Sequence, residues 1–81
     1  MTNLQINPWS ETLMQQTRTG IEDMEFTTDG CIHFKHQTLG FATAAIEDLM
    51  QDRLVLVAKI SEIEYKFEGV EDLLAAGWAV D

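Results

Sequence analysis

The stretch LVLVA at residues 54–58 is the longest uninterrupted apolar run in the chain. It is rich in branched residues and apolar at both odd and even positions, which is typical of an inner strand covered on both faces. A strand of this kind needs neighbouring strands and a cover, so the chain has to build a sheet with a core. The run is far shorter than the ~20 apolar residues of a membrane-spanning helix, and we expect no membrane segment.

A second strand is predicted at residues 63–67, where the sequence IEYKF alternates apolar and charged side chains. A tight turn at residues 61–62 would join it to the apolar run, with paired residue numbers that sum to 123. Leu56 then lies beside Phe67. Ser-Glu is a poor dipeptide for a tight turn, so a bulge in one long strand remains an alternative.

A first hairpin is predicted around the only cysteine and both histidines of the chain, in TTDGCIHFKH at residues 27–36. Met24 and Phe26 face one side if they pair with Phe34 and Ile32, which requires paired numbers that sum to 58. The loop is then Thr28-Asp29-Gly30, with Gly30 in the left-handed region that this loop length needs.

Helical patterns occupy three other segments of the chain. Asn7 and Pro8 predict the start of a helix over residues 8–17, because Asn is a favoured N-cap and Pro is favoured at the first helical position. Apolar residues recur at helical spacing in residues 41–53, which we predict to be the main helix. Residues 70–76 predict a short helix with acids in its first turn.

The order helix, hairpin, helix, hairpin, short helix predicts an α+β fold in one domain over residues 1–81, with residues 1–6 frayed. Two hairpins form a four-stranded, mostly antiparallel sheet that packs on the helix at residues 41–53. We expect the core residues to be Met24, Phe26, Ile32, Phe34, Leu54, Leu56, Tyr65 and Phe67. So small a core is marginal, and we expect a homodimer that also covers Val55 and Val57.

The chain is strongly acidic, with 14 acids against five bases and a net charge of −9. This charge repels phosphate groups, so we expect no direct binding to nucleic acid or to anionic membranes. The acidic residues either serve only to keep the protein soluble or form a surface that binds a partner with a basic surface. One cysteine forms no internal disulfide and the N-terminal sequence does not resemble a signal peptide, so we expect a cytoplasmic protein.

Cys31 and His33 are candidate metal ligands or a thiol site, since residues two apart on a strand share a face. A solvated pair is the simpler interpretation, because zinc-ligand spacings are missing and an acidic neighbourhood raises the pKa of a thiol. We expect no cofactor and no enzymatic activity. On this interpretation His33 faces Glu25 and His36 faces Glu22.

We therefore predict a small, non-enzymatic module that acts by binding another protein. An alternative is an inhibitor whose acidic surface mimics nucleic acid, of the kind found on phages and mobile elements. A second alternative is a small metal- or thiol-dependent enzyme centred on Cys31 and His33. The predicted partner-binding residues are Glu47, Asp48, Asp52, Glu62, Glu64, Trp9 and Trp78.

Overall fold

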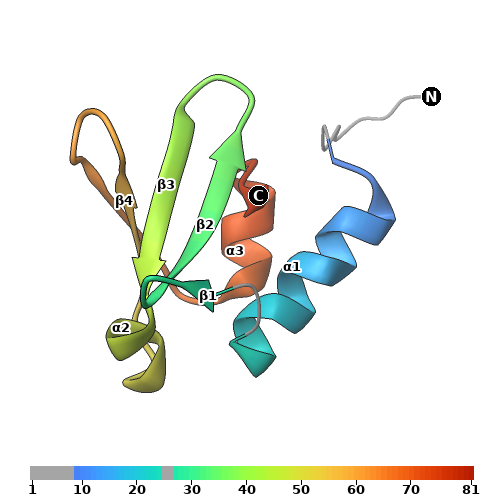
Figure 1. Ribbon diagram of the computed structural model, residues 1–81. Coiled ribbons are helices and arrows are strands. Elements are labelled where there is room, and N and C mark those ends of the chain that lie inside the picture. Colours follow the sequence, from blue (N-terminus) through green and yellow to red (C-terminus); the bar gives the residue numbers. More distant parts are fainter. Residues whose placement is uncertain (1–8, 25–26) are drawn as a thin grey trace.

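The computed structural model describes residues 9–24 and 27–81, which form helices beside an antiparallel sheet (Figure 1). The α+β class agrees with the prediction. The elements in chain order are α1 (Glu11–Asp23), β1 (Thr27–Thr28), β2 (Cys31–His36), β3 (Gly40–Ala45), α2 (Ile46–Met50), β4 (Leu54–Ala58), β5 (Glu64–Phe67), α3 (Val70–Ala75) and β6 (Ala79–Val80).

Within the described residues, the sheet has six strands rather than the four predicted, in the order β1-β2-β3-β4-β5, with β6 paired to β2 beside β1. The main error in the prediction is the helix over residues 41–53. Its first part is β3, in which buried Ala42 and Ala44 alternate with more exposed residues, and only α2 is helical. Alanine-rich segments match both periods, and pairing with β2 and β4 selects the strand.

The first hairpin turns more tightly than predicted. Thr27 pairs with Ile32, so paired numbers sum to 59 and the loop is the dipeptide Asp29-Gly30. Both residues have positive φ, 47° and 79°, which suits the type I′ turn that Asp-Gly favours. Met24 is not in a strand, because it ends α1 with φ 55°, and Phe26 lies outside the described residues.

The second hairpin has the predicted faces and a different register. Leu54 pairs with Phe67 and Leu56 with Tyr65, so paired numbers sum to 121 rather than 123. The longer connection at residues 59–63 accounts for the difference. A shift by an even number leaves every side chain on its predicted face, whereas an odd shift would have exchanged the two faces.

Helix α1 begins and ends later than predicted. Ser10 is the N-cap, and its Oγ accepts a hydrogen bond of 3.1 Å from the Leu13 N–H. The predicted cap, Asn7-Pro8, and the frayed residues 1–6 lie outside the described part of the chain. The helix continues through Gly20, which the sequence suggests as a stop, because that glycine is buried inside the fold.

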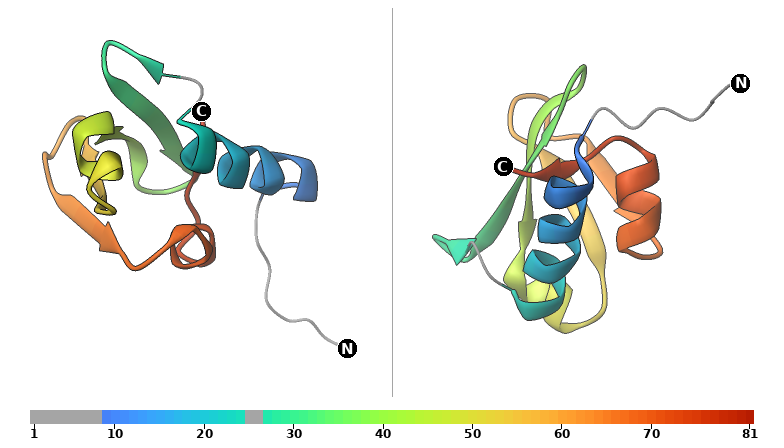
Figure 2. Two further views of the ribbon diagram at one scale, coloured as in Figure 1. Left: turned by 90° about the horizontal axis from the view of Figure 1, so that it is seen from below. Right: turned by 90° about the vertical axis from the view of Figure 1, so that its right-hand side faces the viewer.

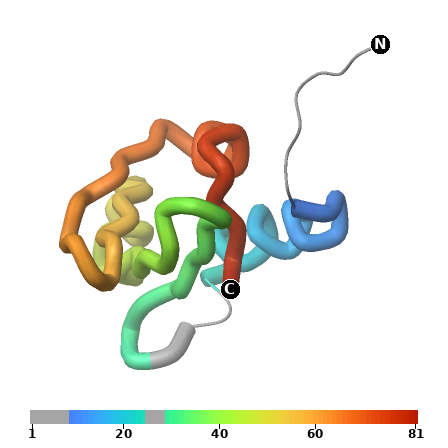
Figure 3. The backbone as a smooth tube through the Cα atoms, turned by 90° about the horizontal axis from the view of Figure 1, so that it is seen from above, coloured from blue at the N-terminus to red at the C-terminus, as the bar shows by residue number. Residues whose placement is uncertain are grey.

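The strands from β2 to β5 curve around one side of the core, and α3 and α1 lie on its other side (Figures 2 and 3). Ile32, Phe34, Leu54 and Leu56 are buried as predicted, whereas Tyr65 and Phe67 are only half-buried. The main cover over this core is α3 with the C-terminal segment, and of the predicted helix only Ile46 and Leu49 in α2 pack against it. The main cover contributes Leu73, Leu74, Trp78 and Val80.

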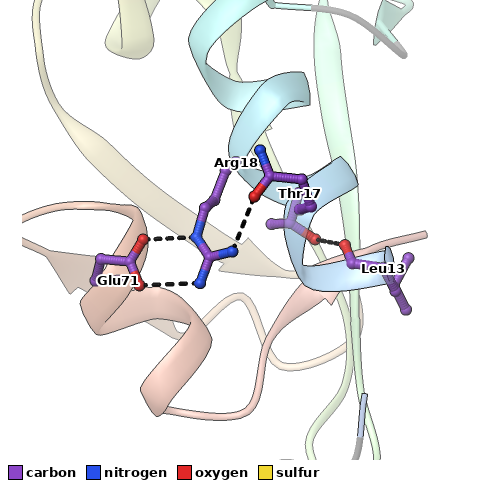
Figure 4. Close-up of polar contacts among 5 residues, drawn as sticks. Leu13, Thr17, Arg18 and Glu71 are labelled. Carbon is purple, nitrogen blue, oxygen red and sulfur yellow. Dashed lines mark hydrogen bonds and ion pairs between the residues drawn. The ribbon is translucent and has the colours of Figure 1, made fainter. Parts of the chain in front are cut away.

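Helix α1 closes the edge of the sheet at β6. Thr17, a polar residue that is fully buried, accepts a hydrogen bond of 3.0 Å from the Val80 N–H at its Oγ1. The same hydroxyl donates to the Leu13 carbonyl at 2.8 Å, which Figure 4 shows. One hydroxyl therefore accepts the outward N–H of Val80 in β6 and links this strand to α1.

We expect Thr17→Val to lower the free energy of unfolding by about 1–3 kcal/mol, because it leaves the buried Val80 N–H without its acceptor. Valine has nearly the shape of threonine, so packing changes little. Thr17→Ser, which keeps the hydroxyl, should be the less destabilised of the pair in urea unfolding. Equal losses in the two variants would show that the methyl group matters more than the hydrogen bond.

Candidate functional site

The antiparallel strands give the sheet two ends of different character. At one end are the Asp29-Gly30 turn, α2 with residues 51–53, and the connection from β5 to α3. The Ile46 N–H donates to the Gly30 carbonyl at 3.0 Å, which joins two of these segments. At the opposite end are the loops at residues 37–39 and 59–63. We call the first the acidic end and the second the apolar end.

The apolar end contains a groove of about 610 Å³. The large apolar side chains that line it are Leu39, 47% exposed, Phe41, 52% exposed, and Ile60, 98% exposed. The Lys59 ammonium lies 5.8 Å from the centre of the Phe41 ring and supplies the charge of the groove lining. The groove can therefore hold an apolar group with a negative charge beside it.

His36 fixes one wall of this groove. Its Nδ1 accepts hydrogen bonds from the Thr38 N–H at 3.1 Å and the Leu39 N–H at 3.2 Å. The proton is then on Nε2, which donates to the Ala76 carbonyl at 2.8 Å. The expected contact with Glu22 is wrong, because the imidazole joins the β2–β3 loop to the end of α3.

The acidic end gathers carboxylates from separate segments of the chain. They are Glu22, Asp23, Asp29, Glu47, Asp48, Asp52, Glu68, Glu71 and Asp72. Two of them pair with an arginine: Arg53 contacts Asp48 at 2.8 Å, and Arg18 contacts Glu71 at 2.7 Å (Figure 4). Hydrogen bonding to Arg18 lowers the pKa of Glu71 below its ordinary value and raises that of the guanidinium.

A cleft of about 710 Å³ opens at the acidic end, between α1, the α2–β4 turn and the start of α3. Its charged lining residues are Arg18, Glu22, Asp52, Arg53 and Glu68, and its apolar lining residues are Ile21, Met24, Leu49, Leu54 and Val70. Both guanidinium groups are paired with carboxylates outside the lining, so the lining combines the acids Glu22, Asp52 and Glu68 with apolar side chains.

The predicted acidic surface is divided between the two ends. Glu47, Asp48 and Asp52 lie together at the acidic end. Glu62 lies in the β4–β5 loop at the apolar end, and Glu64 lies on the outermost strand. These acids therefore do not form one continuous site.

The two tryptophans differ in how far they are buried. Trp78 is completely buried, with its ring 5.5 Å from that of Tyr65, so a partner cannot reach it while the fold is intact. The expectation of a Trp78 contact surface is therefore wrong. Trp9 is half-buried, donates from Nε1 to the Gly77 carbonyl at 2.8 Å, and lies under the Lys35 ammonium.

Cys31 and His33 share the open face of β2, as the sequence predicts. The His33 Nε2 lies 3.5 Å from Asp29 Oδ1, and Cys31 is a half-buried free thiol. Within residues 9–24 and 27–81, no three histidine, cysteine or acidic side chains come together as a metal site would require. The predicted facing residue Glu25 lies outside the described part.

The groove at the apolar end was not predicted. Its residues were assigned to regular elements, Phe41 to the core of a helix and residues 59–60 to the end of a strand. The available signal was Leu39-Gly40-Phe41, since Gly40 has φ 92° and ends a turn between two large apolar residues.

None of the helices in the described part of the chain is both long and apolar enough to span a membrane. Comparison of the chain with protein-family models, with curated proteins and with solved structures finds no match.

Proposed function

We propose that this chain is a non-enzymatic protein-binding module whose apolar end docks on another protein. The observation that carries the proposal is Ile60, a fully exposed aliphatic side chain beside half-exposed Leu39 and Phe41 at one groove. Scattered apolar residues on a surface need no explanation, but a gathering at a groove marks interaction sites. Burying these side chains on a partner would remove them from water.

The groove lining suggests the chemistry of the partner segment. Lys59 lies beside the Phe41 ring, while the chain as a whole has a net charge of −9. A carboxylate next to the apolar side chains of the partner would pair with this ammonium. Acidic side chains of the partner that face the chain elsewhere would be repelled by its negative charge. We infer that the occupant is an apolar segment of a protein with a carboxylate at its flank.

We expect Ile60→Ser to weaken partner binding at least tenfold, because an apolar side chain at the centre of an interface contributes about 2 kcal/mol. Met50→Ser is the matched control, since Met50 is 69% exposed at the acidic end. Affinity capture from cell extract identifies the partner, and calorimetry with purified proteins measures both variants. Equal affinity of the Ile60→Ser variant and the unchanged chain would sink the proposal.

A second candidate function is an inhibitor that mimics nucleic acid, and the gathering of carboxylates at the acidic end favours it. Such an inhibitor would bind a basic groove, and its affinity would fall steeply as salt rises. The same titration at increasing salt separates the two candidates, because apolar docking at Ile60 is largely insensitive to salt. For the metal-dependent alternative, the described residues around Cys31 and His33 include no group of three metal-ligand side chains.

A further inference from the structure

The two edges of the sheet are treated differently. At β6, the outer N–H of Val80 is satisfied by Thr17 of α1. At the opposite edge, β5 is the last strand in the sheet order, and no other strand of the described chain pairs with it. Its Glu64 and Lys66 side chains are exposed. An open edge is a template for a further strand.

The hydrogen-bond pattern shows which backbone groups of β5 face outward. The Ala58 N–H donates to the Ile63 carbonyl at 2.9 Å, so these residues form a hydrogen-bonded pair in the register of β4 and β5. Such pairs alternate along an antiparallel ladder, and Tyr65 and Phe67 therefore also bond to β4. The N–H and C=O groups of Glu64 and Lys66 point away from β4, to the open edge.

We propose that this edge binds the same strand of a second copy of the chain, in antiparallel orientation about a twofold axis at Tyr65. In this register paired residue numbers sum to 130. Glu64 of each copy then lies opposite Lys66 of the other, and the two pairs exchange their backbone hydrogen bonds. A continuous sheet crosses the dimer.

Charge selects this register over its neighbours. A sum of 128 places Glu64 opposite Glu64, and a sum of 132 places Lys66 opposite Lys66, so both put like charges together across the seam. Odd sums place core-facing side chains opposite outward-facing ones and break the alternation of the two faces. Within the strand Glu64–Phe67, only the register centred on Tyr65 places Glu64 opposite Lys66.

The other face of β5 supports the same register. A sum of 130 places Ile63 opposite Phe67 of the second copy and the two Tyr65 rings opposite each other. Ile63 is 53% exposed and Phe67 is half-buried, so both gain cover from the pairing. Aromatic and branched residues are favourable cross-strand partners. The seam is short, which places the dimer among weak, reversible complexes with a Kd of about 10–1000 μM.

Charge exchange tests the register directly. Lys66→Glu makes both pairs Glu-Glu and Glu64→Lys makes both pairs Lys-Lys, so each variant alone should dimerise at least about tenfold more weakly. An equimolar mixture of the two restores the opposite pairs and should associate, as should the double variant Glu64→Lys with Lys66→Glu. Sedimentation equilibrium from 10 μM to 1 mM measures all five samples, including the unchanged chain.

Amide hydrogen exchange supplies a second measurement on the unchanged chain. The Glu64 and Lys66 amides should become protected as the concentration rises, while the Tyr65 amide, already bonded to β4, should not change. Lys66→Pro removes an outward N–H without breaking a bond to β4 and should abolish the dimer in a folded chain. A chain that stays monomeric at 1 mM, or a dimer indifferent to these substitutions, would overturn the proposal.

Discussion

Trp78→Ala should remove most of the stability of the fold, with a loss of about 3–5 kcal/mol in the free energy of unfolding. The indole is completely buried at the junction of α3, β2 and β5. Its ring lies 5.0 Å from that of His36 in a T-shaped arrangement and 5.5 Å from that of Tyr65 in a tilted one. A domain of this size has about 4–12 kcal/mol in total, so the loss takes a large share of it.

Urea unfolding followed by circular dichroism measures the effect, and Trp78→Phe is the conservative variant. Phenylalanine keeps an aromatic ring in the core and should recover a large part of the loss. Trp9→Ala is the surface comparison, because Trp9 is only half-buried and should cost less than about 2 kcal/mol. Equal costs at the two tryptophans would contradict the central place of Trp78 in the core.

The sequence was most informative where alternation was strong. The faces of β2 and β5 follow directly from it, because burial of one face fixes every second side chain. The sequence of β4 is apolar at every position, and the structure buries only Leu54, Leu56 and Ala58 fully, with Val55 and Val57 half-buried. The short helix α3 was also predicted, since its first-turn acids and Gly77 are local signals. Register was less accessible, because it depends on turns such as residues 59–63, whose conformation includes Glu62 at φ 62°.

The errors occurred where one local signal fits two structures. Residues 40–45 satisfy a helical period and a strand period alike, and only their neighbours β2 and β4 decide between them. Gly20 resembles a helix stop, yet it is buried within α1. The groove around Ile60 needed loops distant in sequence to meet at one end of the sheet. Such contacts arise in the tertiary structure, and short-range sequence patterns do not encode them.

Gly77→Ala should destabilise the fold by about 2–4 kcal/mol, because it adds a steric clash to backbone strain. Gly77 has φ 99°, a conformation that residues with side chains rarely adopt. A Cβ atom there would lie 2.7 Å from His36 Nε2. The imidazole cannot easily move away, because its two nitrogens hold the Ala76 carbonyl and the amides of the β2–β3 loop.

Gly40→Ala separates the two contributions. Gly40 has a similar φ of 92°, but a Cβ there would meet no atom within 4 Å, so this variant reports strain alone. The excess loss in Gly77→Ala then measures the clash with His36. Combining Gly77→Ala with His36→Ala should cost less than the sum of the single changes, because the clashing ring is gone. Strict additivity in urea unfolding would mean that the imidazole does not occupy this position, and that the loop bearing Leu39 is not anchored through it.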